Sequence, residues 1–341
     1  MPENTFSLKR LVTEDARAVL AVARFVRDEL GVELRGARLI VALSGGADST
    51  ALLVFFCVLQ EHLDLTLFAA HLDHGLRPES AAEAKAAEDL CRRFGVPFFV
   101  KRENVGEMAQ KWHCGVEEAG RRVRYDFLED CRMRAGARWV LTAHHAGDLA
   151  EDMLMRLSRG ASWPGLGGMR GVVDEPGRHL LRPLLMLEKK DCTAMLQRLG
   201  IEWQEDASNK SRAWKRNRVR LDVMPLFLEE NPSFFDCVRR LWRAARRDER
   251  YWQQRVNAAL HETEEGMFIA DATLRELDEA GRLRAMAEAL RRLRGQARAD
   301  VLEDMEKAWR RRLFPRRFSF GGGVKAELSG RGVLFHAAPG R

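Results

Sequence analysis

The chain has 341 residues, and 57 Lys and Arg against 50 Asp and Glu give it a formal net charge of +7. Its length fits one large domain or two ordinary ones, because a single hydrophobic core stops growing at about 250–300 residues. With 46% hydrophobic residues, 31% charged residues and only 10 prolines, the composition excludes a fibrous or largely disordered protein.

The longest apolar run, Ala51–Leu59, is about half as long as a membrane span, and the first residues lack the basic and then apolar order of a signal peptide. We therefore expect a soluble, cytoplasmic protein without membrane contact. Six cysteines are scattered without a C-x-x-C pair, which argues against zinc ribbons and cysteine-ligated clusters and predicts reduced thiols, most of them buried.

Positive charge is concentrated in two segments. Lys210–Arg250 carries a net +6 and Gly281–Arg317 a net +7, which leaves −6 for the rest of the chain. A basic region beside a mildly acidic one fits the binding of a polyanion, although solvated, arginine-rich helices would produce the same pattern.

The first half of the chain alternates between apolar runs and helical periodicity. A helix is expected at Thr13–Leu30, and an apolar stretch that begins another helix follows Ser44-Gly45-Gly46. Strands are expected at Leu39–Leu43, Leu65–Ala70, Pro97–Val100 and Trp139–Thr142. Further helices are expected at Glu79–Phe94 and Val116–Ala135. This alternation predicts an α/β fold with a doubly wound, Rossmann-like parallel sheet. Ligands of such sheets bind at the carboxyl ends of the strands. Three polar clusters are expected there: Ser44–Ser49, His71–Arg77 and His144–Glu151.

The second half begins with a short extended run, Leu180–Leu184, and a helix, Leu187–Leu199. The polar segment Glu205–Arg216 marks a boundary, so we expect a first domain at residues 1–215 and a second, basic domain that fits a polyanion at residues 216–341. Leu221–Arg312 reads as arginine-rich helices, and the glycine-punctuated last 25 residues read as a small β-hairpin. The second domain is thus predicted to be mainly helical.

The segment Ser44–Ser49 reads S-G-G-A-D-S between a buried strand and a helix. Its glycines let backbone N–H groups turn toward a phosphate, its hydroxyls add donors, and the following helix N-terminus adds a positive dipole. The Walker lysine is absent, so the loop suits pyrophosphate, and Asp48 is a candidate ligand for a magnesium ion that bridges phosphates. A glycine turn with an Asp helix cap is the alternative.

The loop resembles that of the N-type ATP pyrophosphatases, whose common step is adenylation of a substrate oxygen. Further motifs occur in the order seen in the tRNA(Ile)-lysidine synthetases of that superfamily: His71–Arg77, Glu118–Tyr125, Thr142–His145, Arg159–Ser162, Leu181–Leu184, Glu205–Asn209 and Arg216–Arg220. The resemblance is continuous over about Leu39–Pro225 and looser beyond it. The chain is similar to a short form of the family, without the extra C-terminal domain of longer members.

Together the motifs and the resemblance assign the candidate site. ATP is assigned to Ser44, Gly45, Gly46, Ala47, Asp48, Ser49, His71 and His74, and Mg²⁺ to Asp48. Catalytic roles are assigned to Asp48, Arg121, Asp148 and Glu151. Lysine and RNA are assigned to Asp148, Glu151, Arg121, Arg124, Arg216, Arg218 and Arg220. Structural roles for the two histidines, and ion pairs of Arg121 and Arg124 with Glu117 or Glu118, remain open at this point.

Asp148 and Glu151 are one helical turn apart, where paired carboxylates can bind Mg²⁺ or the ammonium group of an amino acid. The family usually reads H-H-x-D-D-Q-x-E-T here, whereas this chain has Gly147, Leu149 and Asp152 at the first Asp, the Gln and the Thr. No role is therefore carried over to the first Asp or the Gln. For Asp148 a helix cap is the alternative. Trp203 and Trp214 are candidates either for stacking on bases or for core packing.

The resemblance implies ligation of L-lysine to C2 of the wobble cytidine, position 34, of a tRNA(Ile) with a CAU anticodon. ATP adenylates the cytidine O2 and pyrophosphate leaves; the lysine amine then displaces AMP. Three alternatives remain open: a tRNA 2-thiolation enzyme of the same superfamily, a small-molecule amide synthetase, and a nucleotide-binding tRNA chaperone without catalysis. Homodimerisation through the second domain is also open.

Overall fold

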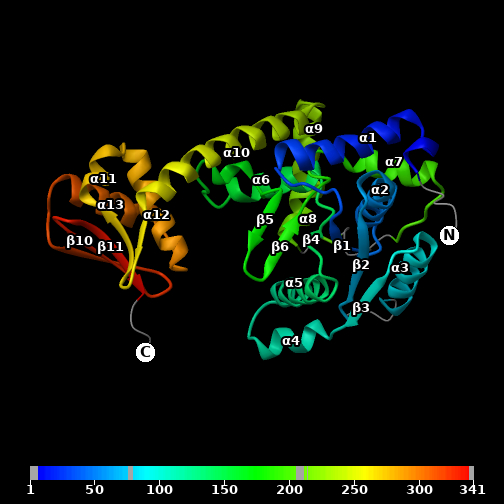
Figure 1. Ribbon diagram of the computed structural model, residues 1–341, viewed down its shortest axis with the longest axis horizontal. Coiled ribbons are helices and arrows are strands. Elements are labelled where there is room, and N and C mark those ends of the chain that lie inside the picture. The colour runs from blue at the N-terminus through cyan, green and yellow to red at the C-terminus, as the bar shows by residue number, and fades with distance from the viewer. Residues whose placement is uncertain (1–6, 76–79, 205–210, 213, 338–341) are drawn as a thin grey trace. The chain divides into compact units, whose positions relative to one another are not determined.

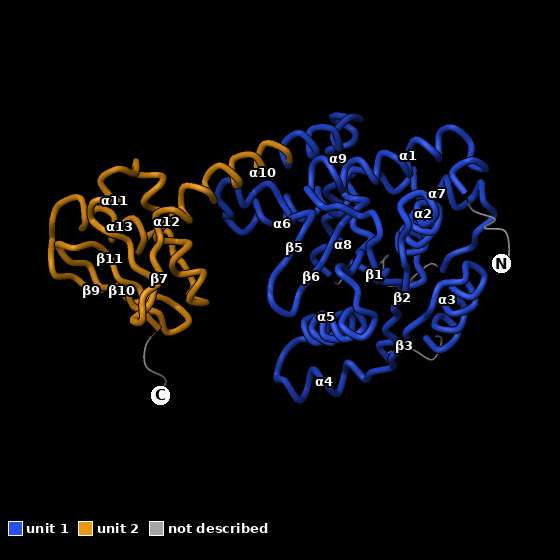
Figure 2. The backbone as a smooth tube through the Cα atoms, viewed as in Figure 1, with its two compact units in different colours: residues 1–242 blue, residues 243–341 orange. Residues whose placement is uncertain are grey.

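The structure is a computed structural model that describes residues 7–75, 80–204, 211–212 and 214–337 (Figure 1). The chain divides into two compact units, residues 1–242 and 243–341 (Figure 2). The boundary expected after residue 215 falls within the first of these units. Of the quoted motifs, Glu205–Asn209 and the end of His71–Arg77 lie outside the described residues.

The first unit is built on a six-stranded sheet. Its strands are β1 (Arg38–Ala42), β2 (Thr66–Asp73), β3 (Phe98–Arg102), β4 (Trp139–Leu141), β5 (Val172–Glu175) and β6 (Arg178–Leu181), in the order β3-β2-β1-β4-β6-β5. All neighbouring strands pair in parallel except β5 and β6, which form an antiparallel pair at one edge. The predicted α/β architecture is confirmed, with the correction that the sheet is mixed rather than wholly parallel.

Helices cover both faces of this sheet (Figure 1). The helices of this unit before α10 are α1 (Thr13–Arg24), α2 (Ala47–Leu63), α3 (Ser80–Phe94), α4 (Val105–Lys111), α5 (Val116–Arg134), α6 (Ala146–Leu157), α7 (Lys189–Arg198), α8 (Lys215–Arg218) and α9 (Met224–Glu230). Short helical turns lie at Leu8–Arg10, Phe25–Glu29, Gly165–Gly167 and Val219–Val223. Side chains of a strand alternate between the two faces of a sheet. Accordingly, Leu39 and Val41 of β1 pack with α1, α2 and α7, whereas Ile40 packs with α5.

The second unit contains the end of α10 (Phe234–Ala259), then α11 (Asp271–Glu276), α12 (Glu279–Arg292) and α13 (Ala299–Arg310). Its five strands are β7 (His261–Thr263), β8 (Gly266–Ala270), β9 (Arg316–Phe320), β10 (Val324–Ser329) and β11 (Gly332–Ala337). They form an antiparallel sheet in the order β7-β8-β11-β10-β9. Helices still make up the larger part of this unit, but the prediction of only a terminal hairpin is wrong: β10 and β11 form that hairpin, and it is part of a five-stranded sheet.

Two further expectations concern the whole chain. All six cysteines are free, and four of them are buried, which confirms the prediction that most of these thiols are buried. Burial raises the pKa of Cys131 to about 11 and the pKa of Cys192 to about 12. Among the helices that the structure describes, none combines the length and hydrophobicity needed to cross a membrane.

Candidate active site

The loop between β1 and α2 is held by its own side chains and by a neighbouring segment. Ser49 Oγ accepts a hydrogen bond from Ser44 N at 3.1 Å and donates one to the Gly46 carbonyl at 3.0 Å. Gly45 has a φ of +88°, a left-handed conformation that glycine adopts without strain. The N–H of Gln204 donates to the Gly45 carbonyl at 3.0 Å. The loop is thus fixed ahead of the α2 N-terminus.

Asp48 in the first turn of α2 has an unsatisfied oxygen. Its Oδ1 atom is buried and has no hydrogen-bond partner, and it lies 3.7 Å from His145 Nε2. Its Oδ2 atom lies 4.0 Å from Lys189 Nζ. A buried carboxylate oxygen without a partner is costly, because its lost hydration is not replaced. A cation or a hydrogen-bond donor at Asp48 Oδ1 would therefore be stabilising.

His145 connects Asp48 to the next carboxylate. Its Nδ1 accepts hydrogen bonds from Gly147 N and Asp148 N, while Asp148 Oδ2 accepts one from His145 N at 2.9 Å, a reciprocal cap of α6. Because Nδ1 is an acceptor, a neutral ring carries its proton on Nε2. That atom lies 3.5 Å from Asp148 Oδ2 and faces Asp48. The helix-cap interpretation of Asp148 is confirmed, and the cap leaves its other oxygen for a further role.

Asp148 and Glu151 are both bound by arginines from the segment that follows residue 214. Arg216 donates from Nε to Glu151 Oε2 at 2.7 Å and from Nη2 to Asp148 Oδ1 at 2.8 Å. Arg220 donates from Nε to Glu151 Oε1 at 2.6 Å and also reaches Asp148 Oδ1 at 3.3 Å. The four predicted residues therefore meet, as two carboxylates matched by two guanidinium groups. Arg218 instead donates to the Arg212 carbonyl at 3.0 Å.

These charges determine the protonation of the site. Burial raises the pKa of Asp148, but the charges of His145 and Arg216 outweigh it and lower the pKa to about 2. Burial lowers the pKa of His144 to about 3, and the positive charges of Arg182 and Arg216 act in the same direction. Near pH 7 the site thus contains an ionised Asp148 beside a neutral His144.

A second group lies where β2 ends. His71 is 4% exposed, and its Nδ1 lies 2.8 Å from the Leu43 carbonyl, so its ring supports the end of β1. Arg124 Nη2 lies 3.2 Å from His74 Nε2 and donates to it. Burial, and then the charge of Arg124, lowers the pKa of His74 to about 4. His74 is therefore a neutral acceptor here, and the structural alternative for His71 is supported.

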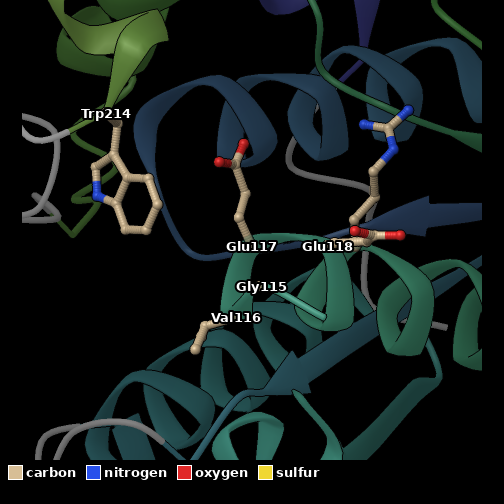
Figure 3. A pocket seen from close by; sticks show the side chains of 6 residues that line it. Gly115, Val116, Glu117, Glu118 and Trp214 are labelled. Carbon is tan, nitrogen blue, oxygen red and sulfur yellow. The ribbon is translucent and has the colours of Figure 1, made fainter. Parts of the chain in front are cut away.

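The start of α5 forms one wall of a cleft with a volume of about 420 Å³. The cleft is lined by Gly115, Val116, Glu117, Glu118, Arg121 and Trp214. Figure 3 shows the Trp214 ring and the Glu117 carboxylate on facing sides. Trp214 is 46% exposed, whereas Trp203 packs against the core of the first unit, so only Trp214 remains a candidate for stacking. Among the described residues, neither Arg121 nor Arg124 pairs with Glu117 or Glu118; Arg121 lies over the Tyr125 ring.

The three departures from the family pattern around α6 have packing explanations. A Cβ at Gly147 would come within 2.8 Å of His145 Cε1, so glycine leaves room for the capping ring. Leu149 is fully buried and packs closely against Gly168. A Cβ atom added to Gly168 would lie only 2.7 Å from Cδ1 of Leu149. Asp152 accepts a hydrogen bond from Arg156 Nε at 2.8 Å. These residues support the helix and leave the Asp148 and Glu151 positions intact.

Sequence reasoning missed three groups of the site. His145 belongs to the Thr142–His145 motif, but spacing alone does not show that its ring lies between two carboxylates. Lys189 at the start of α7 and Gln204 beside Gly45 follow no motif, and only the packing of distant segments places them at the loop.

Known proteins match both the fold and the sequence. The family model described as the PP-loop domain matches residues 17–227. A tRNA(Ile)-lysidine synthase of Nitratidesulfovibrio vulgaris is 44% identical over 332 residues, covering 91% of this chain and 95% of that protein. The chain belongs to the PP-loop family of tRNA(Ile)-lysidine synthases. Its first unit is accordingly an ATP-binding PP-loop domain.

Other relatives are longer. The tRNA(Ile)-lysidine synthases of Geobacter sulfurreducens and Thermus thermophilus are 37% and 35% identical, and the matches cover 82% and 88% of this chain. They cover only 60% and 57% of those proteins. Among solved structures, the U34-tRNA thiolase NcsA from Methanococcus maripaludis matches with a TM-score of 0.57 and 14% identity, over 69% of this chain and 79% of that one. At this identity the likeness shows the fold alone.

Proposed function

We propose that the chain converts the wobble cytidine of a CAU-anticodon tRNA(Ile) to lysidine, using ATP and L-lysine. The observation that carries the proposal is the connection through His145 between a phosphate-binding loop and a pair of acidic side chains. A loop of this kind suits the polyphosphate of ATP, and the acidic pair suits an amine nucleophile. One site can therefore bind both ATP and L-lysine, the two reactants that react with the RNA.

The reaction has two steps. The cytidine O2 attacks the α-phosphate of ATP, and the bond to the β-phosphate breaks to release pyrophosphate. The ε-amine of lysine then attacks C2, AMP leaves with the O2 oxygen, and the amine loses its proton. Adenylation turns a poor leaving oxygen into a good one. The backbone N–H groups of Gly46, Ala47 and Asp48 and the Ser44 hydroxyl would bind the departing pyrophosphate, while Ser49, whose hydroxyl donates to the Gly46 carbonyl, would hold the loop in shape.

Asp48 fits a magnesium ion by its chemistry. Magnesium in nucleotide enzymes is commonly held by one or two carboxylates together with substrate phosphates, and Asp48 presents a buried, unpartnered oxygen at the loop. Within the described part of the chain no cluster of three or more His, Cys, Asp or Glu side chains could hold a metal alone, so ATP oxygens would complete the coordination. The ion would neutralise charge that develops on the phosphates.

Asp148 and Glu151 would bind an ammonium group of lysine, and Arg216, Arg218 and Arg220 would contact the RNA. Arg216 and Arg220 already occupy the two carboxylates. Glu151 has a side chain that is only 3% exposed, so lysine reaches it only when these arginines move. RNA phosphates compete for the same guanidinium groups. We therefore expect lysine binding and RNA binding to be coupled.

The target base must leave the anticodon stack to reach the α-phosphate, and such extrusion requires a grip on the surrounding RNA. Arg121 and Arg124 near the start of α5, and the arginine-rich second unit, are the candidates for this grip. That the chain is cytoplasmic, and that it forms a homodimer, stay predictions.

The test is incorporation of labelled L-lysine into tRNA(Ile) with a CAU anticodon, in the presence of ATP and Mg²⁺. We expect label at the wobble cytidine, none without ATP, and none in elongator tRNA(Met), which has the same anticodon. If the chain binds tRNA(Ile) without incorporating lysine, the proposal fails and the binding-only alternative gains support. Incorporation of sulfur at an anticodon base instead would favour the thiolation alternative.

A further inference from the structure

A group of positive side chains surrounds Tyr125 in the space between α5 and β6. Arg178 begins β6 and Arg182 follows its last residue, while Arg121 lies one turn before Tyr125 on α5. The guanidinium carbon of Arg178 is 4.3 Å from the centroid of the Tyr125 ring, and that of Arg121 is 5.0 Å from it. Three arginines from separate positions thus converge on one phenol.

No carboxylate balances these charges among the described residues. Arg182 is only 6% exposed, and its Nη1 donates to the Arg170 carbonyl at 2.5 Å. The Nε atoms of Arg178 and Arg182 are buried and have no hydrogen-bond partner. Burial raises the pKa of Tyr125, but the charges of Arg121, Arg182 and Arg178 outweigh it and lower the pKa.

Like charges that are partly removed from water are costly unless an anion compensates them. A phosphate is the anion that best matches planar guanidinium groups, since each can donate two parallel hydrogen bonds to its oxygens. Arg138 shows the contrast within the same sheet. It lies 4.6 Å from the Trp139 ring in a similar stacked arrangement, but its Nη2 donates to Asp174 at 2.7 Å. Among the described residues the Tyr125 group has no acidic partner of this kind, and its member Arg121 lines a cleft.

Two observations favour RNA as the source of the phosphate. The loop for ATP phosphates follows β1, whereas β6 is two positions away in the order β1-β4-β6. Arg121 also lines the cleft that contains Trp214 (Figure 3). The volume of this cleft, about 420 Å³, accommodates a nucleoside. An exposed indole beside a cation is a common platform for an unstacked base.

We propose that Arg178, Arg182 and Arg121 bind a backbone phosphate of the RNA substrate, and that the base of that nucleotide enters the cleft against Trp214. The site takes one unpaired nucleotide that adjoins the target cytidine. This inference rests on the proposed function for the identity of the RNA, but its contacts are separate from the ATP loop and from Asp148 and Glu151.

The first test compares Arg178→Gln with Arg138→Gln in the full chain. We expect Arg178→Gln to weaken binding of an anticodon stem-loop RNA about tenfold at moderate salt, and to reduce the slope of log affinity against log salt by about one. Arg138→Gln should leave both unchanged. The affinities for ATP and for pyrophosphate should be the same in both variants and the wild type.

The second test concerns the base. Trp214→Ala should weaken RNA binding about tenfold, because one base loses its stacking partner, while Trp214→Phe should retain most of the affinity. Replacing loop nucleotides one at a time by abasic residues should identify a position that weakens binding to the wild type and not to Trp214→Ala. A control variant, Met133→Ala, removes an apolar side chain that is more exposed than Trp214, 61% against 46%, and lies at the end of α5 far from the cleft.

The outcomes separate this inference from the proposed function. Weaker ATP or pyrophosphate binding by Arg178→Gln, with RNA binding intact, would assign the phosphate to ATP and overturn the RNA source. Equal RNA affinity and salt slope in Arg178→Gln and the wild type would overturn the site itself, even if lysine is incorporated. RNA binding without lysine incorporation overturns the proposed function, but the effects of the Arg178 and Trp214 variants on RNA affinity can still be measured. A wild-type chain that binds no RNA overturns both.

Discussion

The Nε atom of Arg220 donates a hydrogen bond of 2.6 Å to Oε1 of Glu151, whose side chain is only 3% exposed. Arg216 holds the other oxygen of the same carboxylate at 2.7 Å. Removing one partner of a buried ion pair is costly, because the remaining charge loses its compensation. In the RNA-free chain the two arginines therefore compete directly with any ammonium ligand of Glu151.

Replacing Arg220 should expose this competition. We expect Arg220→Ala to bind lysine several-fold more tightly than the wild type in the absence of RNA, because part of the Glu151 carboxylate becomes available. The same variant should bind tRNA(Ile) more weakly, since one phosphate contact is lost. Isothermal titration with lysine, and a filter-binding assay with the RNA, measure the two effects.

Arg218→Ala is the matched control, because Arg218 lies between the two arginines in the sequence and donates to the Arg212 carbonyl at 3.0 Å. It should lower RNA affinity and leave lysine affinity unchanged. Tighter lysine binding by Arg218→Ala, or no change in Arg220→Ala, would contradict the assignment of lysine to this acidic pair.

Asp48 gives a second prediction, based on its unpartnered oxygen. Asp48→Asn keeps the size of the side chain but removes the charge, so lysine incorporation should fall at least 100-fold while tRNA affinity is nearly unchanged. The dependence of the residual rate on Mg²⁺ concentration should shift to higher concentrations. Glu61→Gln, an exposed residue near the other end of α2, is the control and should behave as wild type. Full activity of Asp48→Asn would place the metal elsewhere.

The sequence predicted most of the first sheet because its central strands are buried on both faces. Such strands read as continuous apolar runs, and β1, β2 and β4 have this character. The edge strand β5 could not be recognised in this way. Its four residues are half-buried or exposed and end in Asp174 and Glu175, so they carry neither an apolar run nor an alternating pattern.

The second unit was mispredicted for a related reason. Strand β7 consists of three exposed residues, and β8 is a five-residue segment between helical stretches rich in arginine. Local composition there favours helix, and the strand pairing of β8 with β11 joins residues more than 60 positions apart. Long-range pairing of this kind leaves no signal in a window of neighbouring residues.

Only those parts of the candidate site whose residues lie close together in the sequence were predictable. The Ser44–Ser49 loop and the spacing of Asp148 and Glu151 are local features. The pairing of Glu151 with Arg220 joins positions 69 residues apart, and the convergence of Arg178 and Arg182 on Tyr125 depends on how α5 packs against β6. The sequence identified Arg216, Arg220, Asp148 and Glu151 as functional, but not that the two arginines pair with the two carboxylates.

His145 provides a third prediction, because its two ring nitrogens have different surroundings. His145→Asn can still cap α6 through its amide oxygen but cannot reach the space between Asp48 and Asp148, whereas His145→Ala loses both. We expect lysine incorporation to fall by about tenfold or more in both variants. Only His145→Ala should also lose about 1 kcal/mol of unfolding free energy, the usual value of a helix cap.

Urea unfolding monitored by circular dichroism measures the unfolding free energy, and incorporation of labelled lysine measures the activity. His62→Ala, which removes an exposed histidine near the end of α2, is the control and should change neither quantity. Unimpaired activity of His145→Asn would mean that the ring serves only as a cap.

The neutral histidines of the site predict how stability depends on pH. Burial lowers the pKa of His144 to about 3, with the charge of Asp148 opposing it and those of Arg182 and Arg216 adding to it; burial and then the charge of Arg124 lower the pKa of His74 to about 4. In the unfolded chain both should titrate near 6.5. Below that pH the unfolded state binds protons that the native state does not, so the free energy of unfolding must fall as the pH falls. The low pKa of Asp148 acts in the same direction, but only below about 4.

Because the unfolded chain binds one proton at each of the two histidines, the free energy of unfolding should fall by up to about 2.7 kcal/mol per pH unit. This slope is approached between about pH 5.5 and 4.5 and becomes small above about pH 6.5. Urea unfolding of the full chain at pH 7.0, 6.0 and 5.0 measures it. His144→Gln should reduce the slope by about half, because one of the two titrations disappears, whereas His62→Gln should not alter it, since His62 is exposed. A free energy of unfolding that is constant from pH 7 to pH 5 would contradict the neutral state of both histidines, and with it the arrangement of Arg124, Arg182 and Arg216 around them.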